Sequence, residues 1–268
     1  MSTSPASSAS SASSASQDRP PPGAPTEMGP PDVAERGAPQ GGVPQKMDRR
    51  LFMQLLGFEA PPGSDVPGIV KALGAALVAG GVPSVIYEDV NHPLGFALLT
   101  WTENPEDFVT KVRPAVESQR AAMLRIRPEL TMLGRTYSSG YETDLAFWLL
   151  NRPRETALNP EWNWAVWYPL RRDGAFERLD SREKGGIMRE HGEIGKAYGA
   201  ADFAHDIRLA CHGLDPNDND FVIGLIGKDL HPLSHVVQAM RRTRQTSEFI
   251  VRMGPFFVGH VVFRNAGR

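Results

Sequence analysis

A repeat in the order of secondary structure constrains this fold more than any other feature of the sequence. Between residues 50 and 145 the hydrophobic spacing predicts a strand, a helix, two strands, a helix and a strand. The same order returns between residues 162 and 264. A βαββαβ unit forms a four-stranded antiparallel sheet with both helices on one face. Two such units predict an α+β protein in which two ferredoxin-like halves form a dimeric α+β barrel within one chain.

The predicted elements divide the chain into two halves and a linker. In the first half we expect helices at 66–82 and 105–124, and strands at 49–58, 83–90, 95–101 and 135–142. In the second half we expect helices at 181–198 and 232–250, and strands at 162–172, 203–213, 220–229 and 255–264. Residues 146–161 form the linker, so the halves are 47–150 and 151–268.

The residues ahead of the first half have a different composition. Residues 1–46 are rich in Ser and Ala and then in Pro and Gly, which predicts a disordered tail. They lack the apolar segment of a secretory signal, and the first 17 contain no basic residue, unlike a transit peptide. The remaining ~220 residues can bury about 70% of their unfolded surface, enough for one large or two small cores.

Charge and composition exclude several classes of partner. The 29 basic and 31 acidic residues give a net charge of −2, and the basic residues are dispersed, so we expect no nucleic-acid partner. No apolar run approaches the ~20 residues of a membrane span. Cys211 is the single cysteine, which excludes an intramolecular disulfide and fits a reducing compartment. These features predict a cytoplasmic protein.

The segment IMREHGEIGKAY, residues 187–198, carries a histidine on an apolar helical face. Three of its residues form one stripe at helical spacing, namely Ile187, Ile194 and Tyr198. His191 lies in this stripe beside Gly192 and Gly195, and each glycine costs about 0.5–1 kcal/mol relative to alanine within a helix. The imidazole is either a core histidine bonded to a carbonyl or a group that faces a flat ligand. Asp180, with Glu183 three residues later, is expected to begin this helix.

Two further segments allow a structural and a functional interpretation. The strand at 162–172 alternates, and one face carries Trp162, Trp164, Val166, Tyr168, Leu170 and Arg172. That face is either plain core or the wall of a flat apolar pocket whose terminal arginine binds a carboxylate. Residues 240–248 place Arg241, Arg244 and Glu248 at helical spacing, as a solvated face or as an anion-binding edge.

In their order and spacing these segments resemble the chlorite dismutase family, and within it the coproheme decarboxylases. The resemblance covers residues 47–264, and it is strongest in WYPLRR, IMREHGEIGKAY, the GLD turn at 213–215, MRRTRQTSE and PFFVG. It implies a homopentamer in which each chain has two ferredoxin-like halves and holds haem in its C-terminal half.

The resemblance also implies roles for individual residues. His191 corresponds to the axial ligand of the haem iron, and its neighbouring glycines would leave room for the macrocycle. Tyr168 corresponds to the tyrosine that carries a radical next to a propionate. The remaining matches are to pocket and propionate-contact positions, namely Leu170, Arg172, Arg241 and Thr246.

The implied reaction is an oxidative decarboxylation. Hydrogen peroxide would oxidise the iron of bound coproheme, and the Tyr168 radical would remove hydrogen from a propionate. The carboxyl group of the propionate would then leave as carbon dioxide, and a vinyl group would remain. Two rounds convert coproheme to haem b. The iron porphyrin is then both the cofactor and the substrate, and the protein positions it.

The sequence departs from the family at two positions that activate the oxidant. Chlorite dismutases carry an arginine thirteen residues after the ligand histidine, and this chain has Ala204 there. The related decarboxylases carry a histidine seventeen residues before the tyrosine, and this chain has Asn151 there. Peroxide activation would then need Gln245, His205 or a residue in a shifted alignment. Two alternatives stay open, a non-catalytic haem-binding or haem-transfer protein and a family member that has lost haem.

Overall fold

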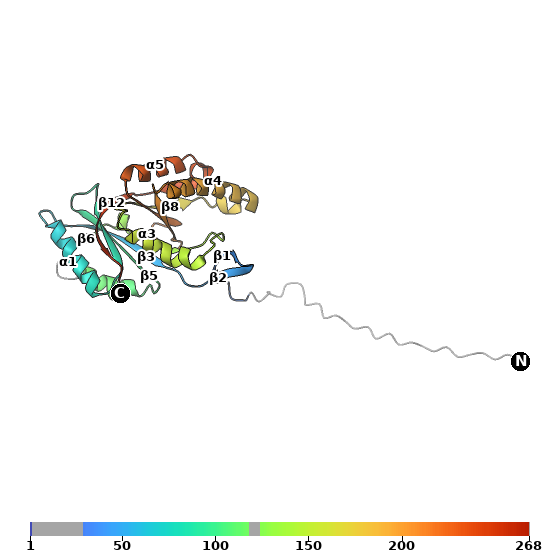
Figure 1. The fold of residues 1–268 in the computed structure, drawn as a ribbon, viewed down its shortest axis with the longest axis horizontal. Helices are drawn as coiled ribbons and strands as arrows, with labels where there is room; N and C mark the ends of the chain where they lie inside the picture. The colour runs from blue at the N-terminus through green and yellow to red at the C-terminus, as the bar shows by residue number, and fades with distance from the viewer. Residues whose placement is uncertain (2–28, 118–123, 268) are drawn as a thin grey trace. The chain divides into compact units, whose positions relative to one another are not determined.

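The computed structural model describes residue 1, residues 29–117 and residues 124–267. The chain divides into one unit from Met1 to Val33 and a second from Ala34 to Arg268. Every helix and strand of the described residues belongs to the second unit (Figure 1). Among the described residues no helix is both long enough and apolar enough to span a membrane.

The first half of the second unit has the predicted βαββαβ order. Its main elements are β3 (Phe52–Glu59), α1 (Val66–Ala79), β4 (Ser84–Asp89), β5 (Gly95–Thr102), η1 (Phe108–Val112), α2 (Arg113–Val116) and β7 (Met132–Thr136). Two short elements, β6 (Arg125–Ile126) and η3 (Pro128–Leu130), precede β7. The strands are antiparallel in the order β7–β3–β5–β4. Helix α1 begins where the Asp65 side chain accepts a 3.1 Å hydrogen bond from the Gly68 amide.

The second half repeats this arrangement. Its elements are β8 (Trp164–Arg172), η5 (Phe176–Arg178), α4 (Ser181–Ala200), β9 (His205–Ala210), β10 (Phe221–Gly227), α5 (Leu230–Met240), η6 (Gln245–Phe249), β11 (Ile250–Met253) and β12 (Phe257–Asn265). The strand order β12–β8–β10–β9 matches that of the first half position by position. The predicted start of α4 is confirmed, because the Asp180 carboxylate accepts a 2.8 Å hydrogen bond from the Glu183 amide.

The two four-stranded sheets close into one barrel. Strand β4 pairs with β12, and β7 pairs with β9, so each half supplies two of the edges that join it to the other. The β8–β10 pairing completes a ring of eight antiparallel strands. This arrangement confirms the predicted α+β class, and the matching strand orders agree with two ferredoxin-like halves.

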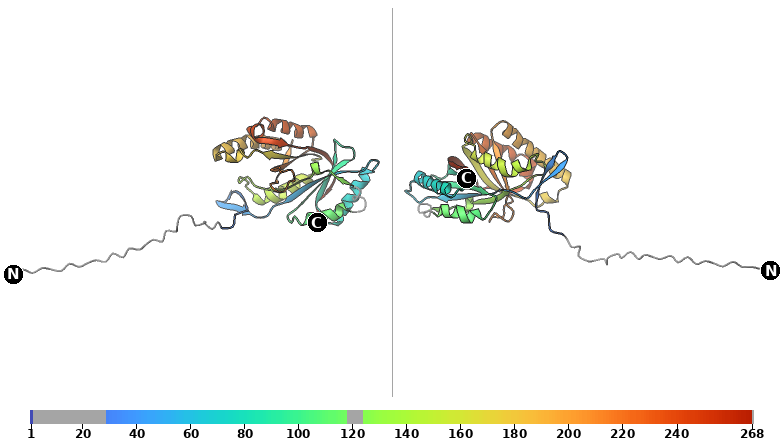
Figure 2. Two further views of the ribbon diagram at one scale, coloured as in Figure 1. Left: turned by 180° about the vertical axis from the view of Figure 1, so that it is seen from behind. Right: turned by 60° about the horizontal axis from the view of Figure 1, so that its bottom comes forward.

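Apolar side chains fill the barrel and cover it on two sides. Inside, the largest buried side chains include Trp167, Tyr87 and Phe257. The outer face of the first half packs against α1, and the outer face of the second half packs against α4 and α5 (Figures 1 and 2). Inward and outward residues alternate along each strand, so one strand serves both the core and an outer layer.

Part of the predicted disordered tail is ordered. Strands β1 (Glu35–Gln40) and β2 (Val43–Met47) form a hairpin across Gly41 and Gly42, both of which have positive φ. The Gln45 side-chain amide donates to the carbonyls of Glu142 and Thr143. The prediction of disorder is therefore wrong for residues 35–46, because composition does not register contacts with distant residues. Residues 2–28 of the predicted tail lie outside the described residues.

Three further predicted elements have wrong boundaries. The helix predicted at 105–124 is helical from Phe108 to Val116, and residues 118–123 of it lie outside the described residues. The strand predicted at 135–142 lies earlier, at Met132–Thr136. The helix predicted at 232–250 ends at Met240, and the π-helical turn η6 and the added strand β11 follow it.

The predicted linker, 146–161, is largely helical rather than a loop. It forms η4 (Phe147–Asn151) and α3 (Arg152–Leu158), and it buries Leu149, Leu150 and Ala157 in the barrel cluster. The composition of this segment does not indicate a helix, because Pro153 and the Asn159-Pro160 pair are typical of loops. In the fold, Pro153 lies in the first turn of α3, where proline is well tolerated.

Candidate functional site

The candidate site lies in the layer between α4 and the outer face of the second-half sheet. Strand β8 directs Ala165 and Trp167 into the barrel, and it directs Val166, Tyr168 and Leu170 into this layer. The alternation predicted from the sequence is confirmed at these positions. Tyr168 therefore faces the helix that carries His191.

The strand register brings two charged residues onto the same face. Ile223 on β10 lies opposite Tyr168 on β8 and opposite Arg208 on β9. Two residues further along β10, Leu225 lies opposite Val166 on β8 and opposite Asp206 on β9. Because the intervening Ile207 is buried in the barrel, Asp206 and Arg208 face outward, toward the helices.

Helix α4 directs its apolar stripe toward this face. Ile187 is buried against Phe176 and Phe249, and Ile194 and Tyr198 pack against the cluster that contains Tyr168. His191 lies between them on the same stripe. Its Nδ1 atom is buried and has no hydrogen-bond partner among the described residues. The pKa of His191 is lowered, chiefly because burial disfavours the charged ring, although the Asp206 carboxylate opposes this shift.

The packing of α4 differs from that of its counterpart in the first half. Five of the 14 residues of α1 are buried, whereas Ile187 is the one buried residue among the 20 of α4, a helix that lies wholly within the described residues. Apart from its chain neighbours and the nearby backbone of α4, a Cβ atom added at Gly192 would meet no described atom within 4 Å, and at Gly195 it would meet only the Met240 methyl, at 3.7 Å. No described part of the protein presses against these glycines. The packing of α4 against the rest of the protein therefore does not explain why glycines stand at these positions.

Tyr168 is buried on the sheet side of the layer. Its ring stacks on Phe256, with a centroid distance of 4.7 Å and an interplanar angle of 27°. Burial raises the pKa of the phenol, and the Asp206 carboxylate raises it further, while Arg241 lowers it. The phenol is therefore protonated at neutral pH. Arg241 is exposed, and its charge acts on the Tyr168 phenol.

A charged network that the sequence did not indicate lies on β9. Arg152 donates to the Asp206 backbone oxygen and to Asp206 Oδ1, both at 2.6 Å, and Arg208 Nε lies 3.1 Å from Asp206 Oδ2. The Arg152 guanidinium lies 4.6 Å from the ring centroid of Trp148. Burial acts to raise the pKa of Asp206, but the two arginines outweigh it, and the pKa is lowered.

No sequence signal identified this network. Arg152 lies in the predicted linker, and the β9 residues carry no motif. Its members meet because η4 and α3 cover β9, a contact made only in the folded chain.

Two further residues predicted for the site lie on the same strand as Tyr168. Leu170 is buried in the same cluster as Tyr168. Arg172 lies at the end of the same strand face, but it pairs with Glu177 at 2.8 Å and lies over the Phe176 ring. Its charge is thus already balanced within the protein.

Three predicted residues lie around the layer or away from it. Gln245 is buried on η6, and its Oε1 atom has no partner among the described residues, while Thr246 beside it contacts Thr243. Asn151 is exposed at the end of η4, and the next residue, Arg152, is the one that reaches β9. Ala204 is buried one residue ahead of β9.

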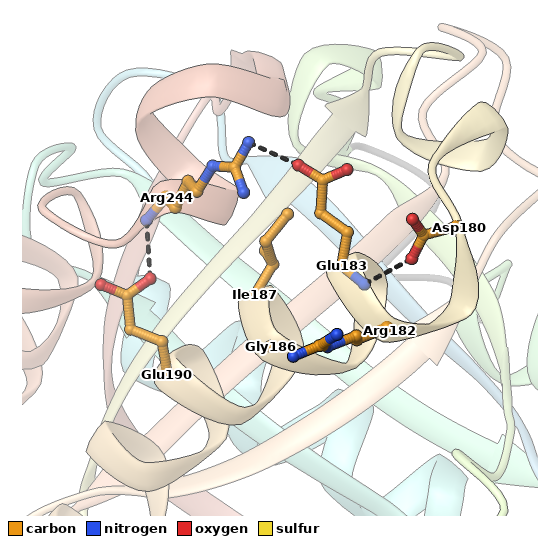
Figure 3. Close-up of a pocket in the computed structure, with 7 residues that line it drawn as sticks. All are labelled: Asp180, Arg182, Glu183, Gly186, Ile187, Glu190 and Arg244. Atoms are coloured by element: carbon orange, nitrogen blue, oxygen red, sulfur yellow. Dashed lines mark hydrogen bonds and ion pairs between the residues drawn. The ribbon is translucent and has the colours of Figure 1, made fainter.

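A cavity of about 440 Å³ lies beside the candidate layer rather than inside it. Its lining is mostly charged and comes from the first half of α4 and from Arg244 (Figure 3). The Arg244 guanidinium pairs with Glu183 and Glu248, both at 2.8 Å, and its amide donates to Glu190 at 2.9 Å. Arg244 is thus satisfied by carboxylates, so the solvated-face interpretation of this residue fits the structure. The cavity contains neither His191 nor Tyr168, so it is distinct from the candidate site.

Comparisons with known proteins agree with this fold. A family model described as chlorite dismutase matches residues 96–262. Among solved structures, a mutant chlorite dismutase from Candidatus Nitrospira defluvii, in complex with cyanide, is 16% identical. It superposes with a TM-score of 0.63 over 81% of this chain and 92% of its own. A haem-binding protein from Thermus thermophilus is 20% identical, with a TM-score of 0.63 over 81% of this chain and 93% of its own. No curated protein matches the sequence.

Proposed function

Because the chain belongs to the chlorite dismutase family, we propose that it binds an iron porphyrin between α4 and the outer face of β8, β9 and β10. His191 would hold the iron through its imidazole. The haem-binding protein from Thermus thermophilus, which has the same fold, supports this proposal.

The observation that carries the proposal is the state of His191. A buried ring nitrogen without a hydrogen-bond partner is costly in a packed core. At Nδ1, His191 is therefore not a core histidine bonded to a carbonyl. Burial also keeps the ring neutral, and the neutral ring is the form that binds a metal. The thin, underpacked helix around Gly192 would leave room for a flat macrocycle. The residues present therefore fit the group that the family implies.

We propose coproheme as the substrate and hydrogen peroxide as the oxidant. For each propionate, one peroxide and one proton are consumed, and one vinyl group, one carbon dioxide and two waters are formed. The iron supplies the two-electron oxidation chemistry once it is bound. The protein binds and orients the porphyrin and keeps water from the propionate.

In this proposal Tyr168 is the group that removes hydrogen from the propionate. Its burial and its raised pKa favour a neutral phenol, which can lose an electron and a proton together and recover them from the propionate side chain. Arg241 is exposed and interacts electrostatically with Tyr168, so it would hold the propionate carboxylate near the phenol. Arg172 would do so only by exchanging its partner Glu177.

We propose coproheme rather than chlorite because of the positions around β9. Ala204 stands where chlorite dismutases have their arginine. The cation nearest along the strand is Arg208, and its charge is paired with Asp206. The homopentamer that the resemblance implies and the cytoplasmic location that the composition indicates stay predictions.

A titration followed by a mass measurement tests the function. We expect ferric coproporphyrin to give a Soret band with the purified protein, and His191→Ala to lose it, while His231→Ala on the exposed face of α5 keeps it. Added peroxide should then yield product that has lost two carboxyl groups as carbon dioxide. A Soret band followed by bleaching without decarboxylation would indicate a haem-binding or haem-transfer protein instead. An absent Soret band would overturn porphyrin binding altogether.

A further inference from the structure

Asp206 is the one carboxylate that the β9 register directs into the candidate layer. It faces outward rather than into the barrel, because Ile207 and Leu209 on either side of Arg208 fill the barrel interior. Although Asp206 lies beneath the helices, 37% of its side chain is accessible. Burial is nevertheless the largest influence on its pKa. The exposed part of this carboxylate is open to a small molecule.

The two arginines fix the orientation of this carboxylate. Arg152 bonds Oδ1 and the backbone oxygen, and Arg208 pairs with Oδ2, so each carboxylate oxygen is held by one guanidinium. A carboxylate can accept about four hydrogen bonds, so each oxygen keeps a lone pair for a further donor. Trp148 lies against both guanidinium groups, with ring centroid distances of 4.6 Å to Arg152 and 5.8 Å to Arg208. The carboxylate is thus held in a preorganised position.

Several charged or titratable groups face Asp206 from the surrounding elements. They are Arg152 on α3, Arg208 on β9, Tyr168 on β8, His191 on α4, and Tyr137 after β7. The charge of Asp206 acts on both Tyr168 and His191, the proposed hydrogen-abstracting phenol and the proposed iron ligand. Asp206 belongs to the sheet and His191 to the helix that covers it, and no hydrogen bond or ion pair joins the two among the described residues.

We propose that Asp206 is the proton-transfer residue for peroxide on the sheet side of the porphyrin, opposite His191. This inference rests on the proposed function. The carboxylate takes the proton from one oxygen of hydrogen peroxide and becomes a carboxylic acid. It then gives that proton to the other oxygen, which leaves as water when the O–O bond breaks. The two electrons come from the iron porphyrin, and Asp206 ends the cycle ionised.

Asp206 would supply the proton acceptor that is missing at the two positions that activate the oxidant in the family. Ala204 carries no proton acceptor, and the exposed amide of Asn151 is a poor base. Arg208 would act as a positioning residue, because its guanidinium holds Asp206 and adds positive charge where the departing oxygen develops negative charge. A general acid–base group of this kind contributes about 10²–10⁴-fold to a rate.

Asp206→Asn tests the proposal, with Asp229→Asn as the matched control at the exposed start of α5. Hydrogen cyanide is the probe besides turnover, because it must lose a proton to bind ferric iron but transfers no electrons. We expect Asp206→Asn to bind ferric coproporphyrin within about threefold of the wild type and to slow cyanide association about tenfold or more. Its peroxide reaction should slow about 100-fold or more. Asp229→Asn should match the wild type in all three measurements.

Asp206→Glu separates a chemical role from a structural one. It keeps a carboxylate, so we expect it to restore most of the cyanide and peroxide rates. It also keeps the proposal testable if Asp206→Asn does not fold. Unchanged rates in Asp206→Asn with intact binding, or Glu rates as low as those of Asn, would overturn the role of Asp206 while porphyrin binding stands. A wild-type protein that binds no coproporphyrin would overturn both proposals.

Discussion

Gly224 on β10 lies directly opposite Trp167 on β8, and the indole ring occupies the space where a side chain at 224 would begin. A Cβ atom at Gly224 would lie 2.5 Å from the ring. Trp167 is fully buried and lies next to Tyr168 in sequence, so this contact fixes the strand that presents the candidate phenol.

We expect Gly224→Ala to destabilise the protein by about 1–3 kcal/mol, because the indole has no free space into which it can move. Urea unfolding of the porphyrin-free protein measures this change. An unchanged midpoint would show that the barrel interior is looser than the contact indicates.

Gly192→Ala should have the opposite effect on the fold. A Cβ atom there meets no described atom within 4 Å, and alanine favours a helix interior by about 0.5–1 kcal/mol over glycine. We expect a more stable porphyrin-free protein that binds ferric coproporphyrin more weakly, because the added methyl group narrows the space beside His191. Equal or tighter binding would argue against a macrocycle at Gly192.

The lowered pKa of His191 predicts a dependence of stability on pH. The ring is neutral in the folded protein and has its ordinary pKa of about 6.5 when unfolded, so the unfolded chain binds more protons below that pH. The free energy of unfolding contributed by this group should therefore fall as the pH drops below about 6.5 toward the lowered pKa. Urea titrations of the porphyrin-free protein between about pH 5 and about pH 8 measure it.

We expect His191→Gln to show a smaller loss of stability at low pH than the wild type does. His231→Gln, on the exposed face of α5, is the control and should follow the wild-type curve. Superimposable curves for wild type and His191→Gln would mean that the imidazole is not held neutral by burial.

Arg152→Ala should cost more stability than Arg154→Ala, although both lie on α3. Arg152 donates two hydrogen bonds at 2.6 Å to Asp206 and is 20% exposed, so we expect a loss of about 1.5–3 kcal/mol. Arg154 is 36% exposed and pairs with Glu103 at 3.2 Å, which predicts a loss of about 0–1 kcal/mol. Thermal unfolding of the two variants side by side checks the order, and equal losses would contradict it.

Tyr168→Phe should keep porphyrin binding and stop decarboxylation. The ring and its stacking on Phe256 remain, but the O–H group that would exchange hydrogen with the propionate is lost. Absorption titration and product mass measure the two effects separately. Wild-type turnover in Tyr168→Phe would remove this phenol from the mechanism.

Much of the fold could be predicted from the sequence because its signals are local. Alternating residues on β8 and the helical stripe of α4 each predicted an element of the right type, and the Asp180 cap predicted where α4 begins. The order of elements then predicted two halves. Boundaries were less predictable where contacts decide them, as at the β1–β2 hairpin, which Gln45 ties to residues almost a hundred positions away.

His191 and Tyr168 could be singled out from the sequence because a buried imidazole beside glycines and a phenol on an alternating strand are visible in single elements. Arg152, Asp206 and Arg208 could not, because no periodicity relates a helix between the halves to a strand of the second half. Only the closed barrel brings α3 over β9 and directs Asp206 toward α4. Local spacing determines which side chains share a face, whereas strand pairing between distant segments decides which faces meet.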